Sequence, residues 1–97
     1  MDIQVSHTHT REEAKRRIET LIHDLKAKYG TQITDLKEDW TGYAGKLEGS
    51  AKGYSVSGAI QIEPDTITVN LKIPFVLRVF SKKIKALVGE QLKNTLS

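Results

Sequence analysis

Hydrophobic and polar residues alternate over residues 2–9, which is the pattern of a β-strand with one buried face. The predicted inner face begins with apolar side chains and ends in two imidazoles: Ile3, Val5, His7 and His9. The residues between them are polar. We therefore expect a first strand that starts over the core and reaches its margin at the histidines.

The next segment has the three- and four-residue spacing of an amphipathic helix. Thr10 and Glu13 fit a capping box, in which each side chain bonds to the backbone amide of the other. Gly30 suits the left-handed position that ends many helices. These features predict a helix over residues 11–29. Its apolar stripe comprises Ala14, Ile18, Leu21, Ile22, Leu25 and Tyr29.

Residues 31–73 return to a period of two, which predicts four strands. Turn sequences separate them at Thr41-Gly42, Lys52-Gly53 and Pro64-Asp65. Connections this short favour an antiparallel meander, and a break in the alternation indicates a bulge near Thr34. The predicted inner faces comprise Leu36, Glu38 and Trp40; Tyr43, Gly45, Leu47, Gly49 and Ala51; Tyr54, Val56, Gly58, Ile60 and Ile62; and Ile67, Val69, Leu71 and Ile73.

The last segment predicts one continuous helix that begins at Pro74, a residue favoured in the first helical turn. Three further apolar residues, Phe75, Val76 and Val79, lie partly outside its stripe. The start of this helix is therefore more apolar than one buried face requires. The stripe itself comprises Leu77, Phe80, Ile84, Leu87, Val88, Gln91, Leu92 and Leu96.

The order of the elements is β-α-β-β-β-β-α, which predicts an α+β domain spanning residues 1–97. A curled antiparallel sheet with two helices on one face would bury every stripe at once. The element order resembles a reduced helix-grip arrangement, with the last helix lying across the sheet. The inward glycines Gly45, Gly49 and Gly58 fit either a sheet curled around a helix or a small cavity.

The composition of the 97 residues is that of a soluble single domain. Cysteine is absent, which excludes disulfides and thiolate chemistry. The opening residues lack the pattern of a secretory signal, and no apolar run is long enough to span a membrane, so we expect a cytoplasmic protein. The net charge of +3 is only weak evidence for a nucleic-acid partner. Because the predicted outer strand faces lack aromatics, we expect no such partner.

His7 and His9 are the first candidates for chemistry, because their rings leave the same strand face two residues apart. A metal site needs a third ligand, and His23 is on the outer side of its helix. The simpler interpretation is a hydrogen-bonded His7 at the core margin and a solvated His9. We expect no metal, and we retain His7 as a candidate ligand contact.

Nothing in the sequence ties a second catalytic group to His7, and the familiar nucleophile, phosphate-loop and metalloprotease motifs are absent. We therefore expect a protein that is not an enzyme and uses no cofactor. Trp40 forms either an aromatic platform with Tyr43 and Tyr54 or part of the cap of the core, which is the commoner use of such rings. Trp40 is kept as a candidate binding residue.

The positive charge is concentrated in the last segment. Residues 75–97 contain five basic side chains against one acidic side chain, a net charge of +4, whereas the remainder of the chain is slightly acidic. Basic residues beside Phe75, Val76 and Val79 suit a helix at a polar–apolar interface, although a solvated basic face on a core helix has the same pattern. The candidate binding cations are Arg78, Lys82 and Lys83.

Short motifs lie along nearly the whole chain: Ile3-x-Val5-x-His7, then Glu12, Glu13, Ala14, Arg17 and Ile18, then Trp40 and Gly42, Gly58 and Ile60, and Ile73-Pro74. Together they resemble the polyhydroxyalkanoic acid system family, also described as granule-region proteins. The resemblance implies a bacterial protein linked to polyhydroxyalkanoate synthesis or use, some members being at the storage-granule surface, and it implies no established reaction.

Three functional hypotheses follow. The first is a non-enzymatic accessory protein that contacts polyhydroxyalkanoate granules, or their proteins, through the last helix. The second is a small carrier that holds an acyl ligand between the curled sheet and that helix. The third, which has the least support, is an enzyme built around His7. The oligomeric state is left open by the sequence.

Overall fold

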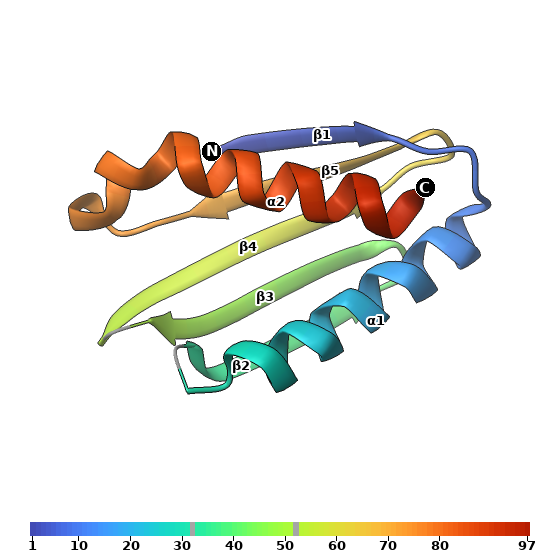
Figure 1. Cartoon of the computed structure of the whole chain (residues 1–97). Helices are drawn as coiled ribbons and strands as arrows, with labels where there is room; N and C mark the ends of the chain where they lie inside the picture. Colours follow the sequence, from blue (N-terminus) through green and yellow to red (C-terminus); the bar gives the residue numbers. More distant parts are fainter. Residues whose placement is uncertain (32, 52) are drawn as a thin grey trace.

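The computed structural model describes residues 1–31, 33–51 and 53–97. Five antiparallel strands form one sheet in the order β1-β5-β4-β3-β2, and two helices accompany it (Figure 1). This confirms the α+β class and the predicted element order. The elements are β1 (Asp2–Ser6), α1 (Arg11–Tyr29), β2 (Ile33–Thr41), β3 (Ala44–Ala51), β4 (Tyr54–Ile62), β5 (Thr66–Lys72), the 3₁₀-helix η1 (Phe75–Phe80) and α2 (Ser81–Leu96).

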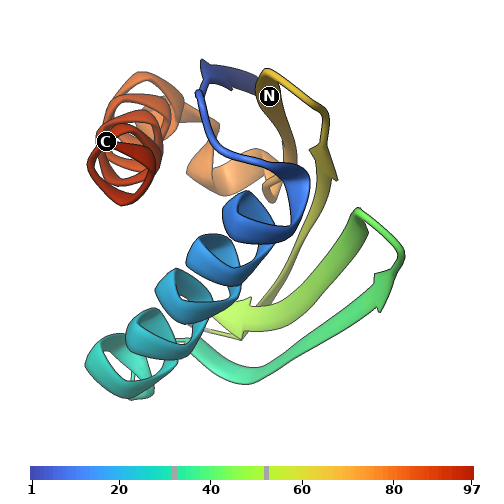
Figure 2. The same cartoon turned by 90° about the vertical axis from the view of Figure 1, so that its right-hand side faces the viewer.

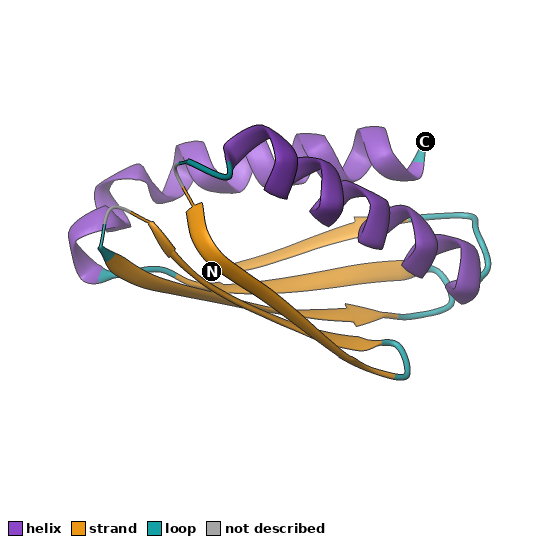
Figure 3. Cartoon of the chain, turned by 90° about the horizontal axis from the view of Figure 1, so that it is seen from below, coloured by secondary structure: helices purple, strands orange, loops and turns teal. Residues whose placement is uncertain are grey.

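Both helices lie on the same face of the sheet, as predicted, and the other face is left uncovered (Figure 3). Viewed along the helices, the sheet curls around α1 (Figure 2). The alternation read from the sequence fixes which side chains point inward, because a strand turns successive residues to opposite faces. β1 pairs with β5 through Ile3 opposite Val69 and Val5 opposite Ile67, so four inward residues meet at this edge.

The core lies between the sheet and the two helices. Its α1 side chains are Ala14, Ile18 and Ile22, which are almost inaccessible to solvent and belong to the predicted stripe. α2 contributes two buried side chains from its last two turns, Leu92 and Leu96, and Val88 packs against the core one turn earlier. The strands supply the remaining buried side chains: Ile3, Val5, Ile60, Ile62, Ile67 and Val69.

The irregular backbone positions lie mainly where the sequence predicted them. The register between β2 and β3 shifts between Thr34 and Lys37, which confirms the bulge. Gly42 has a positive φ of 60° and Gly53 a φ of 82°, as tight turns between antiparallel strands require. The other half of the predicted Lys52-Gly53 turn, Lys52, lies outside the described residues.

The first helix has the predicted bounds, but two details of its ends differ from expectation. The Thr10 hydroxyl accepts from the Glu13 amide, which confirms half of the capping box. The Glu13 carboxylate instead accepts hydrogen bonds from Arg16 and Arg17, since these long side chains lie on the next turn. Gly30 is right-handed, with a φ of −61°, so the helix ends without the expected left-handed residue.

The predicted continuous last helix is wrong in its first part. Residues 75–80 form the separate 3₁₀-helix η1, Pro74 precedes this helix as its N-cap, and the α-helix begins at Ser81. α2 also packs along β1 and against α1 instead of lying across the middle of the sheet. As a result, Phe80 and Leu87, which were predicted to face the core, are more than half exposed.

Candidate functional site

The candidate site is the end of the molecule where η1 joins α2. Four apolar side chains of this short segment are exposed: Phe75 (84%), Val79 (82%), Phe80 (53%) and Val76 (48%). Soluble monomers expose single apolar residues routinely, but a cluster of large ones on adjacent positions commonly marks an interaction surface. The prediction that Phe75, Val76 and Val79 lie outside the buried stripe therefore agrees with the structure.

Basic side chains lie within this apolar segment and follow it along the chain. The guanidinium of Arg78 lies 5.8 Å from the centre of the Phe75 ring, within the range of a cation–π contact. Lys82, Lys83 and Lys85 follow on the first turns of α2, and all three are exposed. We call Arg78, Lys82, Lys83 and Lys85 the basic cluster. Between Phe75 and Lys85 the sequence contains no acidic residue.

The arrangement of the two helices explains why this end is exposed. At the opposite end, His9 Nε2 donates to the Leu96 carbonyl over 2.6 Å, and Arg17 donates to the Thr95 and Ser97 carbonyls. These bonds satisfy carbonyls that a helix leaves without partners at its C-terminus. The helices meet at this closed end and diverge toward η1, the open end (Figure 1).

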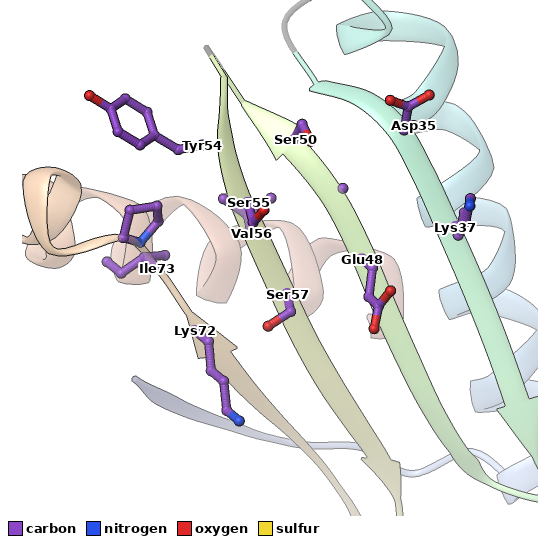
Figure 4. Close-up of a pocket in the computed structure, with 12 residues that line it drawn as sticks. Asp35, Lys37, Glu48, Ser50, Tyr54, Ser55, Val56, Ser57, Lys72 and Ile73 are labelled. Atoms are coloured by element: carbon purple, nitrogen blue, oxygen red, sulfur yellow. The ribbon is translucent and has the colours of Figure 1, made fainter.

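Tyr54 adds a side chain from the sheet to the open end. It was predicted to face the core, but it is 45% exposed because it begins β4 where no helix covers the sheet. Tyr54 and Ile73 lie on the same side of a hollow of about 650 Å³ on the outer face of the sheet (Figure 4). We define the end patch as Tyr54, Phe75, Val76, Val79 and Phe80. Period-two alternation could not identify Tyr54, since it assigns only a face and not what covers that face.

β1 ends at Ser6, so the predicted strand over residues 2–9 is too long, and His7 and His9 lie in the connection that follows it. Both histidines bond to backbone groups at the closed end. The buried His7 accepts from the backbone amide of His9 at Nδ1 and donates from Nε2 to the Glu63 carbonyl. Both of its ring nitrogens are therefore engaged by backbone groups. The rings of His7 and His9 stack, with centroids 6.2 Å apart. His9 is not simply solvated as predicted, because it caps the carbonyl end of α2.

Trp40 and Tyr43 lie together at the β2–β3 turn and pack against the core margin. The amine of Lys15 lies 5.2 Å from the Trp40 ring centre, and Arg11 lies 4.6 Å from that of Tyr43. The three-ring platform, which was the less common of the two expected arrangements, does not form, because Tyr54 is at the other end of the sheet. Trp40 thus closes the core and takes no part in the end patch.

Two carboxylates on the first turn of α1 have shifted pKa values. Hydrogen bonds from Arg16 and Arg17 lower the pKa of Glu13 to about 2. The hydroxyl of Tyr43 donates to Glu12 over 2.6 Å, which lowers the pKa of Glu12 and raises that of Tyr43. These contacts connect the closed end of α1 to the sheet and involve none of the predicted binding residues.

The inward glycines are explained by packing and not by a cavity. A methyl group built on Gly45 would lie 3.0 Å from three atoms of the Trp40 ring. On Gly58 it would lie 3.1 Å from the Leu71 side chain, and on Gly49 it would approach Ile33 and Leu36. The glycines therefore make room for neighbouring side chains of the sheet. They give no support to an acyl ligand held above them.

The fold and the end patch together define a class of protein: a small α+β domain with a curled antiparallel sheet that presents apolar and basic side chains at one end. The sequence model of the polyhydroxyalkanoic acid system proteins (PHA_gran_rgn) matches residues 1–96. The chain belongs to this family. No helix in the described part of the chain is long and apolar enough to cross a membrane.

Other comparisons add little to the family assignment. No curated protein matches the chain. Among solved structures, the chain is similar to the crystal structure of TTHA0849 from Thermus thermophilus, with 14% identity, a TM-score of 0.38, and coverage of 99% of this chain and 94% of that one. This TM-score is too low for the two folds to be equated.

Proposed function

We propose that this protein is a non-enzymatic accessory protein of polyhydroxyalkanoate metabolism that docks on the storage-granule surface in the cytoplasm through the end patch. The observation that carries the proposal is the exposure of Phe75 and Val79, each above 80%, in a member of this family. Neither side chain contributes to the core. Both are free to enter an apolar phase without any rearrangement of the fold.

The size of the patch suits reversible docking. Burial of a Phe or Val side chain is worth roughly 1.5–3 kcal/mol, so a few such residues supply a useful fraction of a micromolar affinity, even after the cost of association. Arg78, Lys82 and Lys83 can lay their aliphatic stems along the apolar phase while their charged ends stay in water. This is the arrangement of helices that lie in an interface rather than cross it.

The non-enzymatic part of the proposal is supported by His7. A general base needs a free lone pair directed at a substrate, and an acid needs a proton that it can deliver there. Nδ1 of His7 accepts from the His9 amide, and Nε2 donates to the Glu63 carbonyl. Its role is to hold the chain connections at the closed end together.

The test is co-sedimentation of the purified protein with polyhydroxyalkanoate granules, for the wild type and a Phe75→Ser/Val79→Ser variant. We expect the variant to bind at least tenfold more weakly, because roughly 2 kcal/mol or more of apolar transfer energy is lost. Its stability should change by no more than about 0.5 kcal/mol per site, since both positions are exposed. Equal sedimentation of the two proteins would rule out the end patch as the docking surface.

A matched control checks that the loss is specific to the patch. Ala44 and Ala59 are exposed on the outer face of the sheet, away from η1. An Ala44→Ser/Ala59→Ser variant makes the same kind of polar substitution at a surface that the proposal leaves in water. It should sediment like the wild type, and a comparable loss would show that docking is not confined to the end patch.

A further inference from the structure

The basic cluster lies at the N-terminus of a helix, where positive charge is unfavourable. This placement indicates that the cations serve a binding partner and not the stability of the helix. The first turn of α2 contains Lys82 and Lys83 and no acidic residue, and its N-cap, Phe80, makes no side-chain capping bond. Cations at a helix N-terminus are repelled by the helix dipole. α1 follows the opposite rule, with Thr10 as its cap and Glu12 and Glu13 in its first turn. An unfavourable local arrangement on an exposed surface is typical of a functional site.

We infer that the end patch and the basic cluster bind anionic phospholipid headgroups, so that docking requires a negatively charged lipid surface. This inference rests on the proposed function and names the chemistry that its docking surface recognises. The apolar side chains of the end patch enter the acyl region, and Arg78, Lys82, Lys83 and Lys85 meet the phosphates. Each cation near such a surface strengthens binding about fivefold.

The charge and shape of the patch favour lipid over a second copy of the chain. Two copies joined through this surface would bring their basic clusters together without a single acid from either segment to offset them. The segment also projects into solvent, with Phe75 and Val79 more exposed than any other large apolar side chains that the structure describes. An exposed apolar segment with exposed cations within it and directly after it can enter a lipid surface without a preformed partner groove.

Two further features favour docking with the open end toward the lipid surface: the exposed Tyr54 at that end, and the acidic residues at the closed end. Tyr54 lines the same hollow as Ile73 and Pro74, the two residues that precede η1. An exposed tyrosine at this end suits the headgroup region, where part of the ring contacts acyl chains and the hydroxyl stays in water. The β4–β5 turn carries Glu63 and Asp65, and both are exposed at the closed end, which would then face away from the anionic surface. The longest dimension of the molecule, 37 Å, separates the two ends and reduces the repulsion between these acids and the surface.

The experiment measures binding to vesicles of phosphatidylcholine alone and of phosphatidylcholine mixed with phosphatidylglycerol. Two variants are compared with the wild type. Lys82→Gln/Lys83→Gln removes charge from the basic cluster, and Lys37→Gln/Lys46→Gln removes the same charge from exposed positions on the outer face of the sheet. All four lysines are exposed, so each variant keeps the folded structure.

We expect the wild type to bind the mixed vesicles at least tenfold more tightly than pure phosphatidylcholine. The Lys82→Gln/Lys83→Gln variant should lose most of that preference, and the Lys37→Gln/Lys46→Gln variant should retain it. Equal binding to both kinds of vesicle, or equal losses in both variants, would overturn the inference.

Comparing binding to granules with binding to vesicles distinguishes a failure of this inference from a failure of the proposed function. If the wild type binds granules through Phe75 and Val79 but ignores anionic vesicles, docking stands and lipid recognition is wrong. If granules treated with protease no longer bind the protein and anionic vesicles also fail, the partner is an acidic granule protein, and the inference is again wrong. Loss of lipid preference in the lysine variant, together with normal behaviour of its control, is the supporting result.

Discussion

The two helices of this protein are built by opposite rules. α1 begins with a threonine cap and two acidic residues, and it buries Ala14, Ile18 and Ile22 against the sheet. η1 and the start of α2 have no side-chain cap and place lysines in the first turn of α2. They leave four apolar side chains exposed, Phe75, Val76, Val79 and Phe80. α1 is thus stabilised along its length, whereas the last segment is stabilised at one end.

This difference separates the part of the chain that makes the fold from the part that is available for binding. In α1 the capping, charge and apolar signals all favour the same packed helix, which is what a funnelled energy landscape requires. In the last segment the apolar spacing favours a helix, but its start has neither a capping side chain nor acidic residues in the first turn. A six-residue 3₁₀-helix takes the place of regular α-helix there. A segment that does not need to pack is free to present its side chains to a partner.

The largest expected effect follows from burial in α1. An Ile18→Ala substitution should lower the free energy of unfolding by about 2–5 kcal/mol, because Ile18 is 1% exposed and its loss leaves a cavity. Val79→Ala should change it by less than about 0.5 kcal/mol. Urea denaturation followed by circular dichroism measures both. A similar loss in the two variants would mean that the last segment is part of the core.

The next effect concerns the hydrogen bonds of His7, one of which positions His9 against the carbonyl end of α2. His7→Ala leaves the His9 amide and the Glu63 carbonyl without partners near the core, which should cost about 2–4 kcal/mol in all. His23→Ala, at an exposed position of α1, is the control and should be nearly neutral. Amide hydrogen exchange should show faster opening of the last turns of α2. Unchanged protection there would contradict the role of the closed end.

A smaller effect should have the opposite sign. Lys82→Gln/Lys83→Gln should raise the free energy of unfolding by about 0.5–1 kcal/mol, since it removes cations from the positive end of a helix dipole. Lys37→Gln/Lys46→Gln should leave stability unchanged. The same variant that binds anionic vesicles more weakly should therefore melt at a higher temperature. A lower melting temperature would show that the lysines support the fold.

The smallest effect is a pH dependence confined to the start of α1. The folded pKa of Glu13, about 2, lies below the ordinary value of 4.5, so this carboxylate stabilises the folded state above the unfolded pKa. That contribution is lost as the pH falls through the interval between the two values. Glu13→Gln should lack it, so the stability curves of the two proteins should converge below that interval. Parallel curves down to the lowest pH would show that the Arg16 and Arg17 bonds are not formed in solution.

Much of the fold was predictable, because over most of residues 1–73 the periodicity and capping patterns favour the same elements that the packing of the core requires. The inward face of β1, the bounds of α1 and the bulge near Thr34 follow from periodicity and capping. The position of β1 beside β5 was not predictable, since sheet order is a matter of long-range contacts. The wrong expectation for Gly30 has the same origin: glycine permits a left-handed residue but does not require one.

The candidate site was predictable only in part. The excess of apolar residues at the start of the last helix correctly identified Phe75, Val76 and Val79 as surface residues. The break between Phe80 and Ser81 was missed, because helical spacing does not distinguish a short 3₁₀-helix from the α-helix that follows it. Tyr54 was assigned to the wrong environment, since its exposure depends on how far the helices extend over the sheet.

The location of Trp40 has a practical consequence for optical experiments. The protein's only tryptophan lies under the amine of Lys15 next to the β2–β3 turn, at the opposite end of the sheet from Tyr54. Its emission should stay constant when the molecule meets vesicles, and quenchers attached to lipid tails should not reach it. Intrinsic fluorescence will therefore monitor the integrity of the domain, while a dye at position 54 or 79 is needed to follow contact.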